Sequence, residues 1–422
     1  MRVFICWLAI MAACIVPDAG WAQQAEQRSD SLEQEIRLLK LRLDSLEQAM
    51  RLMGGGEQES AEPVDELAAL RAAARAIAPE QPADTTPRQS VMRSRNLNRL
   101  NPEISVTGDM SFNATQPGPI QDNVDLREFS FGFQSPLDPY SNAKVYIDFG
   151  GGEFSLEEAY AYWTGLPGGI RLDIGRFRQQ VGELNRWHGH ALPETEYPLV
   201  VTEFMSEDGL IGNGVGAYWL APFTSPGGAT HELWGQVTVA DNEALFDQGR
   251  RLSFLGHLNN FWQLNQSTYL QLGGNALYGE NPDANLETSL FGVDFRVTWR
   301  PPEMALFRSF TLRGEGYALR QNVGGTTDTR YGGYGGFEYQ ASRRLYLGSR
   351  FDYVQPRGTA GDDGRYMWAF VPKITFWQTE YVFLRAEWQH LSSPLLGGGR
   401  ESTNRFMIQV VWSMGPHKHE TY

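Results

Sequence analysis

The sequence predicts an all-β fold, a transmembrane antiparallel β-barrel of about 16 strands that is preceded by a short coiled-coil helix. Three observations predict it. From about residue 101 to residue 414, apolar and polar residues alternate with a period of two, as they do in half-buried strands. Aromatic residues recur at the ends of these segments, where the interfacial girdles of a membrane barrel lie. The connections alternate between short turns and longer polar loops, which is typical of outer-membrane barrels.

The segment YVFLRAEWQH illustrates the alternation. Its apolar residues occupy one face and its charged or amide residues the other: Val382, Leu384, Ala386 and Trp388 against Arg385, Glu387 and Gln389. A soluble sandwich would also use such an apolar face, but it would not so regularly carry aromatic residues at the strand ends. We count sixteen segments of this kind. An even number returns both chain ends to the periplasmic side.

The first residues predict export. Residues 1–22 have the layout of a signal peptide, with Arg2, an apolar run and the small residues of Gly20-Trp21-Ala22. A lipoprotein site with an acylated Cys14 is the alternative. Both cysteines, Cys6 and Cys14, lie in this segment. Cleavage after Ala22 therefore leaves no thiol, and this excludes disulfides, cysteine-ligated metals and cysteine nucleophiles.

Residues 25–53 form the predicted coiled-coil helix, which we expect in the periplasm. The segment RLDSLE, Arg42 to Glu47, resembles a pattern of parallel three-stranded coils. Leu38, Leu41 and Leu52 widen the apolar stripe, so a dimer or a single helix packed on its own barrel are alternatives. The apolar residues of the helix are spaced alternately by four and three, which is a heptad seam for a trimer: Leu32, Ile36, Leu39, Leu43, Leu46, Met50 and Met53.

The regions that flank the barrel differ from it in composition. Residues 54–100 read as a linker that contains a short alanine-rich helix, and residues 415–422 form a C-terminal tail. By strand parity the segment IRLDIGRF runs outward, and the longest connection follows it as the third outer loop. We expect this acidic loop to fold inward and narrow the pore. The predicted constriction comprises loop residues and wall arginines: Glu183, Arg186, His188, His190, Glu194, Glu196, Glu203, Glu207, Asp208, Arg296, Arg313, Arg350 and Arg385.

The loop motif His188-Gly-His190 admits two interpretations. Two histidines beside carboxylates suit a metal ion, whereas in the simpler interpretation they hydrogen-bond the loop to the barrel wall. The polar residues form no catalytic triad, no His-Glu-x-x-His and no phosphate-binding loop. The sequence thus predicts that the protein is not an enzyme, and it predicts neither a cofactor nor a nucleic-acid partner.

The layout resembles known porin families. A coiled coil ahead of a barrel of this size resembles the dicarboxylate- and sucrose-type coiled-coil porins. The segment IGRFRQQVGELNRW resembles the phosphate-selective porin O and P family, although the loop lacks a run of lysine or arginine. The resemblance covers roughly residues 101–414. It implies a homotrimeric channel for small solutes or ions in the outer membrane of a Gram-negative-type bacterium.

Two functions are consistent with these features of the sequence. The first is passive diffusion of small hydrophilic solutes, with a weak preference for cations. The formal net charge is −14, while the predicted inward faces nearly balance, so the excess acid should lie in the loops. The second is an envelope tether, in which the barrel anchors the coiled coil. About 30 helical residues at ~1.5 Å each span only about 45 Å, too little to cross the periplasm, which favours the channel.

The seam predicts a trimer whose thermal stability falls when Leu39, Leu43 and Leu46 are replaced by polar residues, because each change puts a polar group into the interhelical core. Mobility on unheated gels and mass measurement in detergent test this. A monomeric parent protein would refute the predicted assembly.

Overall fold

The computed structural model describes residues 102–117, 123–225, 227–240, 242–247, 251–357, 365–395 and 398–415. The predicted signal peptide, the coiled-coil helix with its seven seam residues, the linker and nearly all of the C-terminal tail lie outside these ranges. The two cysteines and the motif His417-Lys-His419 lie outside them too. No helix within the described ranges is long and apolar enough to cross a membrane.

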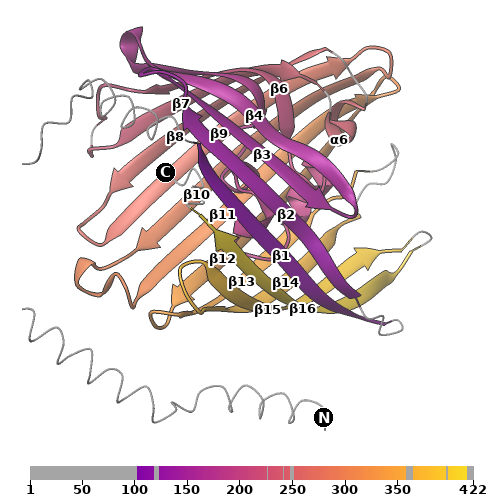
Figure 1. Ribbon diagram of the computed structural model, residues 1–422. Coiled ribbons are helices and arrows are strands. Elements are labelled where there is room, and N and C mark those ends of the chain that lie inside the picture. The colour runs from indigo at the N-terminus through magenta and orange to yellow at the C-terminus, as the bar shows by residue number, and fades with distance from the viewer. Residues whose placement is uncertain are drawn as a thin grey trace, which may run out of the picture. The chain divides into compact units, whose positions relative to one another are not determined.

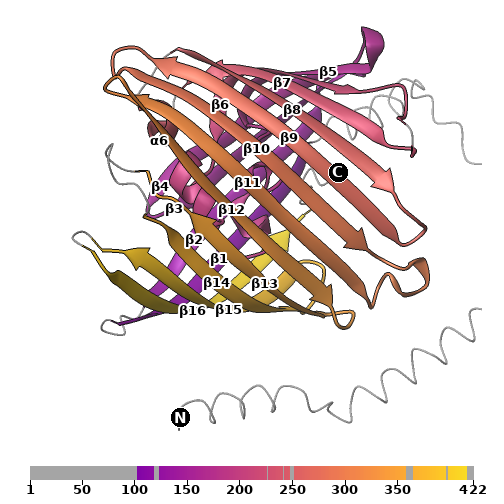
Figure 2. The ribbon, with the colours of Figure 1, turned by 180° about the vertical axis from the view of Figure 1, so that it is seen from behind.

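The described chain forms one closed barrel in which every strand pairs antiparallel with its sequence neighbours, and this confirms the predicted all-β class and strand number (Figures 1 and 2). The ring closes where β1 pairs with β16, from Val106 opposite Met414 to Gln116 opposite Asn404. The strands are β1 (Glu103–Gln116), β2 (Asn123–Pro136), β3 (Ser141–Gly150), β4 (Glu153–Leu166), β5 (Ile170–Arg178), β6 (Ile211–Leu220), β7 (Thr230–Val239), β8 (Leu252–Gln263), β9 (Thr268–Asn281), β10 (Leu286–Trp299), β11 (Ser309–Val323), β12 (Thr326–Gln340), β13 (Leu345–Val354), β14 (Met367–Trp377), β15 (Val382–Pro394) and β16 (Arg400–Met414).

The alternation along each strand separates an apolar exterior from a polar interior. In β15, Leu384 and Trp388 are 42% and 41% exposed, whereas Glu387 between them is 2% exposed. Among the wall arginines of the predicted constriction, Arg350 and Arg385 are buried as well, while Arg296 and Arg313 are partly buried. Apolar side chains therefore face outward around the ring, and charged side chains line the inside.

Two β-bulges interrupt the alternation near β3. Between β1 and β2 the register passes from Asp109 opposite Glu128 to Met110 opposite Leu126, so Arg127 is the extra residue. Between β3 and β4 it passes over Glu157 in the same way. A bulge re-aims the side chains around it. As a result, the consecutive carboxylates Glu157 and Glu158 both bond to the same histidine inside the barrel.

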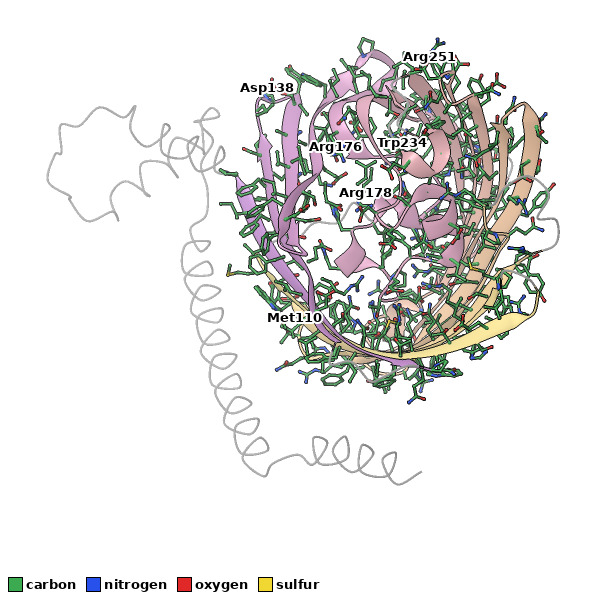
Figure 3. All side chains as sticks on the ribbon, turned by 90° about the vertical axis from the view of Figure 1, so that its right-hand side faces the viewer. Met110, Asp138, Arg176, Arg178, Trp234 and Arg251 are labelled. Atoms are coloured by element: carbon green, nitrogen blue, oxygen red, sulfur yellow. The ribbon has the colours of Figure 1, made fainter. Side chains whose placement is uncertain are left out.

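Two connections return into the barrel. The connection between β5 and β6 carries the 3₁₀ turns η2 (Leu184–Arg186) and η3 (Gly189–Ala191) and the helix α5 (Leu199–Met205), and the connection after β7 carries α6 (Glu243–Phe246). Short turns η1 (Pro167–Gly169) and η4 (Pro302–Met304) close two other hairpins. Figure 3 looks into the ring of strands, where Arg178 lies inside, beside these returning segments.

Helices α5 and α6 pack against the inner wall. Phe204, Val201, Leu245 and Phe246 are almost fully buried. They belong to one hydrophobic cluster with inward-facing wall residues, among them Leu255, Leu277, Leu290, Leu319 and Val354. The barrel therefore contains a small apolar core on one side of its interior, which the alternation had not predicted.

The absence of a side chain at Gly332 in β12 makes room for α5. A Cβ at Gly332 would lie 2.6 Å from Cγ2 of Val200 and 2.9 Å from Cγ2 of Val354, whereas at Gly335 of the same strand it would meet nothing within 4 Å. We expect Gly332→Ala to destabilise the protein by about 1–3 kcal/mol through overpacking, and Gly335→Ala to have little effect. Unfolding midpoints in detergent test this pair. Equal midpoints would contradict the packing of α5 on β12.

Candidate functional site

Residues 179–210, which we call the lumen loop, cross the interior of the barrel. Asn185 joins the two ends of the loop, because its amide donates to the carbonyls of Gln179 at 2.7 Å and Leu210 at 3.0 Å and accepts from the Leu210 N–H at 2.7 Å. The first residue of the loop, Gln179, also donates to Thr238 of the neighbouring wall strand β7 at 2.9 Å. Asn185 is fully buried, so this clasp fixes the entry and the exit of the loop together.

Wall carboxylates bind the backbone of the lumen loop. Oε1 of Glu315 in β11 accepts from the N–H groups of Glu183 at 2.9 Å and Leu184 at 2.8 Å. Glu387 in β15 accepts from the N–H of Thr195 at 2.9 Å. A backbone N–H buried away from water needs a partner, and here the charged wall supplies it.

Ion pairs fix the acidic side chains of the loop to the opposite wall. Glu183 pairs with Arg296 at 2.7 Å and lies 4.0 Å from Arg313. Glu194 pairs with Arg350 at 3.1 Å and with Lys373 at 3.0 Å. Glu196 also pairs with an arginine of β16. Three acids of the loop are thus neutralised by wall bases, so they add little net charge to the interior.

The two histidines of the loop bond to carboxylates of β2 and β4. Nδ1 of His188 lies 3.1 Å from Glu157, and Nε2 lies 3.1 Å from Glu158. His190 lies 2.6 Å from Glu128, and its ring stacks on that of His188 with centroids 5.7 Å apart. Burial alone would lower the pKa of His188, but its bonds to the two glutamates raise it to about 9. Both histidines therefore anchor the loop to the wall, as the simpler interpretation of the motif expects.

A small polar pocket remains beside the loop near β3 to β5. Lys144, Glu158, Tyr160 and Arg178 line it together with Arg186 of the loop and other residues. The Nε of Arg186 is buried and has no hydrogen-bond partner within the described part of the chain. Most of the other charges are paired, for example Lys144 with Glu158 at 3.2 Å.

The structure brings some of the predicted site residues together and separates others. The loop acids Glu183 and Glu194 meet the predicted wall arginines. Arg385 instead donates to Gln409 at 2.9 Å. Glu207 and Asp208 are exposed and form no ion pair among the described residues, while Glu203 is half-buried.

Sequence reasoning missed several partners of the loop. Glu128 and Glu157 lie beside the two bulges, where the strict alternation used for the prediction fails. Lys373, which pairs with Glu194, is also absent from the predicted constriction. A pair of adjacent acids such as Glu157-Glu158 in an otherwise alternating strand is a signal of a bulge that could have found them.

Comparisons with known proteins support the fold. No family model matches the chain, so the resemblance to the phosphate-selective and coiled-coil porin families stays a prediction. An uncharacterized protein of Aquifex aeolicus is 42% identical over 323 residues. The match covers 67% of this chain but only 66% of that protein, slightly less than two thirds of its length.

Among solved structures, the chain is similar to outer-membrane porins. Pseudomonas putida OprB gives a TM-score of 0.52 at 10% identity, over 76% of this chain and 96% of that one. An anion-selective porin from Comamonas acidovorans gives 0.51 at 11% identity, over 74% and 99%. A loop-deletion variant of OmpT, an outer membrane protein of Vibrio cholerae, gives 0.51 at 8% identity, over 74% and 99%. At these identities the likeness establishes the barrel fold alone.

The double ion pair of Glu194 predicts a measurable contribution to loop order. We expect Glu194→Gln to destabilise the folded loop by about 1.5–3 kcal/mol, the usual range for hydrogen bonds to a charged group. The effect stays within this range because Arg350 still pairs with Asp352, and Lys373 still pairs with Glu338, in the variant. Amide hydrogen exchange of residues 193–199 measures this. Glu207→Gln, at an exposed position without an ion pair, is the control and should exchange like the parent.

The same carboxylate sets a pH dependence. Burial alone would raise the pKa of Glu194, but the charges of Lys373 and Arg350 lower it to about 2 from the ordinary 4.5. A lowered pKa stabilises the folded loop fully above the ordinary value, and the stabilisation is lost as the pH falls through the lower one. Pepsin cleavage within the loop should therefore increase as the pH falls from about 4.5 toward about 2. A cleavage rate of the parent, relative to that of Glu194→Gln, that stays constant over this range would contradict this ion pair.

Proposed function

We propose that the protein is an outer-membrane channel for the passive diffusion of small hydrophilic solutes or ions, with the lumen loop as its constriction. The observation that carries this proposal is the two-sided wall. Apolar side chains such as Leu384 and Trp388 face outward, while Arg350, Asp352 and Glu387 face inward. A sheet with this pattern suits lipid outside and water inside.

The similarity to outer-membrane porins supports a channel in the outer membrane rather than an enzyme. The charged side chains of the interior are organised as pairs between loop and wall, such as Glu183 with Arg296. Pairing leaves little reactivity at these groups, and it suits a polar passage better than a catalytic centre. The proposed homotrimer rests on the heptad seam of residues 25–53, which also underlies the alternative tether.

Ion selectivity should depend on the acids that remain unpaired. The expectation of a weak cation preference came from the whole acidic loop, but three of its acids are neutralised by wall bases. Glu207 and Asp208 are exposed where the loop returns to β6. Exposed charges of one sign raise the local concentration of the opposite ion. We assign the cation preference to these two residues, with Glu203 as a weaker contributor because it interacts with Arg357.

Single-channel recording in a planar bilayer tests the channel. The parent protein should conduct, and its reversal potential in a salt gradient should indicate a weak preference for cations. The double variant Glu207→Gln with Asp208→Asn should move the reversal potential toward zero, because it removes two unpaired negative charges. Glu303→Gln, in the exposed turn η4 after β10, is the matched control and should not move it.

Two outcomes would contradict the proposal in different ways. A parent protein that does not conduct would argue against the channel itself. Clear anion selectivity in a conducting parent would argue only against the role of Glu207 and Asp208. It would indicate that Arg186, Arg296 and Arg313 in the interior set the selectivity instead.

A further inference from the structure

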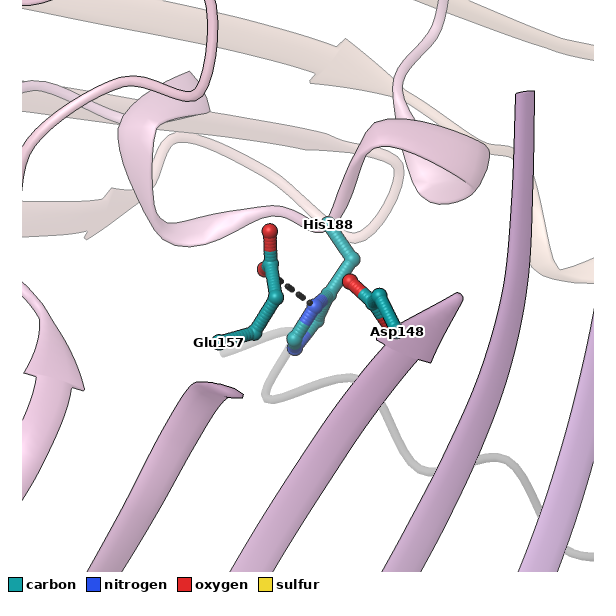
Figure 4. Close-up of side chains that lie close together, drawn as sticks. All are labelled: Asp148, Glu157 and His188. Carbon is teal, nitrogen blue, oxygen red and sulfur yellow. Dashed lines mark hydrogen bonds and ion pairs between the residues drawn. The ribbon is translucent and has the colours of Figure 1, made fainter. Parts of the chain in front are cut away.

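One histidine and two carboxylates meet where the lumen loop approaches β3 and β4. The ligand atoms of Asp148, Glu157 and His188 all lie within 4.8 Å of one another. Asp148 comes from β3, Glu157 from the bulge in β4 and His188 from the loop, so three separate segments of the chain converge (Figure 4). Nitrogen and carboxylate oxygen together form the kind of ligand set that binds Zn²⁺ and similar divalent cations.

The distances suit a shared cation. Nδ1 of His188 and Oε2 of Glu157 are 3.1 Å apart. Two atoms that ligate one tetrahedral Zn²⁺ at about 2.0–2.1 Å lie about 3.3 Å from each other. The histidine and the glutamate therefore already have the spacing of two ligands. Asp148 needs only a small side-chain rotation to join them, because no ligand atom of the three is farther than 4.8 Å from another.

Hydrogen bonding of the loop to the wall does not account for the buried carboxylate of Asp148. It is 7% exposed, and its Oδ1 is buried without a hydrogen-bond partner in the described part of the chain. In Figure 4 its carboxylate points toward the imidazole of His188. A buried polar atom without a partner is costly. A bound cation would supply the partner that Oδ1 lacks.

Neighbouring side chains fix the orientation of the His188 imidazole, as they do for histidines that bind a metal ion. Nε2 of His188 bonds to Oε2 of Glu158 at 3.1 Å, and Lys144 holds the same oxygen at 3.2 Å. A carboxylate behind the second ring nitrogen fixes the orientation of a metal-ligating histidine. Arg178 donates to the same Oε2 of Glu157, and this holds the carboxylate beside the imidazole.

We propose that Asp148, Glu157 and His188 form a divalent-cation site for Zn²⁺ that ties the lumen loop to the barrel wall. The cation takes the place of the proton between His188 and Glu157. His190 is not a ligand, since its Nδ1 bonds to Glu128 at 2.6 Å. This assignment goes beyond the channel function and does not depend on conduction.

Calorimetric titration of the purified full chain in detergent with ZnCl₂ tests the site, and visible absorption of added Co²⁺ provides a second readout of the ligand geometry. The titrations use a background with His417→Ala and His419→Ala, because that pair offers two further imidazoles. Three variants are compared with this parent: Asp148→Asn, His188→Gln and His190→Gln. His190→Gln is the matched control, because it removes the neighbouring ring and leaves the three ligands.

The parent and His190→Gln should bind one Zn²⁺ per chain with equal affinity. Asp148→Asn and His188→Gln should weaken binding by about tenfold or more, at least the effect expected for loss of an outer-shell partner. Should His188→Gln disturb the loop, Asp148→Asn still decides, because Asp148 Oδ1 holds no bond that the substitution would break. The site would be refuted by a parent that does not bind Zn²⁺, or by an Asp148→Asn variant that binds it as tightly as the parent does.

Discussion

Closure of the sheet between β1 and β16 is the constraint on which the other features depend. A strand in hydrocarbon has no water to satisfy its N–H and C=O groups, so an open edge would be very costly. The pairing of Val106 through Gln116 with β16 removes that edge. Closure also creates an interior that is separated from the outer face of the wall, which contacts lipid in the proposed outer-membrane location. Only there can the wall carry residues such as Asp352 and Glu387, which are almost completely buried.

The polar groups inside the barrel find hydrogen-bond partners in the backbone of the lumen loop as well as in side chains. The lumen loop brings backbone N–H groups to Glu315 and Glu387, and its own acids to wall bases such as Arg350. On the other side, α5 and α6 bury apolar groups against Leu290 and its neighbours. An irregular segment at membrane depth is tolerated only where protein or water satisfies it. The loop meets this condition with a polar side and an apolar side that match two different parts of the wall.

Much of this arrangement could be predicted from residue patterns, and the exceptions have physical causes. Alternation identifies the strands and the inward direction of Arg350 and Glu387, because side-chain direction has a period of two. It fails at Glu157, since a bulge inserts one residue and shifts the period. Adjacent apolar residues, as in Phe254-Leu255, mark wall positions that are apolar on both faces. Which wall residue each side chain of the loop bonds to could not be predicted, because contacts between distant residues leave no local pattern.

The reach of the lumen loop has a consequence for the order in which the barrel assembles. The Thr195 hydroxyl bonds to Gln409 of β16, a residue 214 positions later in the chain. Thr195 also bonds through its N–H to Glu387 of β15. Neither contact can form before the last strands have joined the wall, and closing so long a connection is entropically costly until the sheet itself holds the ends together. The contacts of Thr195 therefore form late, after β15 and β16 are in place, whereas the contacts of the loop with β7 and β11 do not depend on these strands.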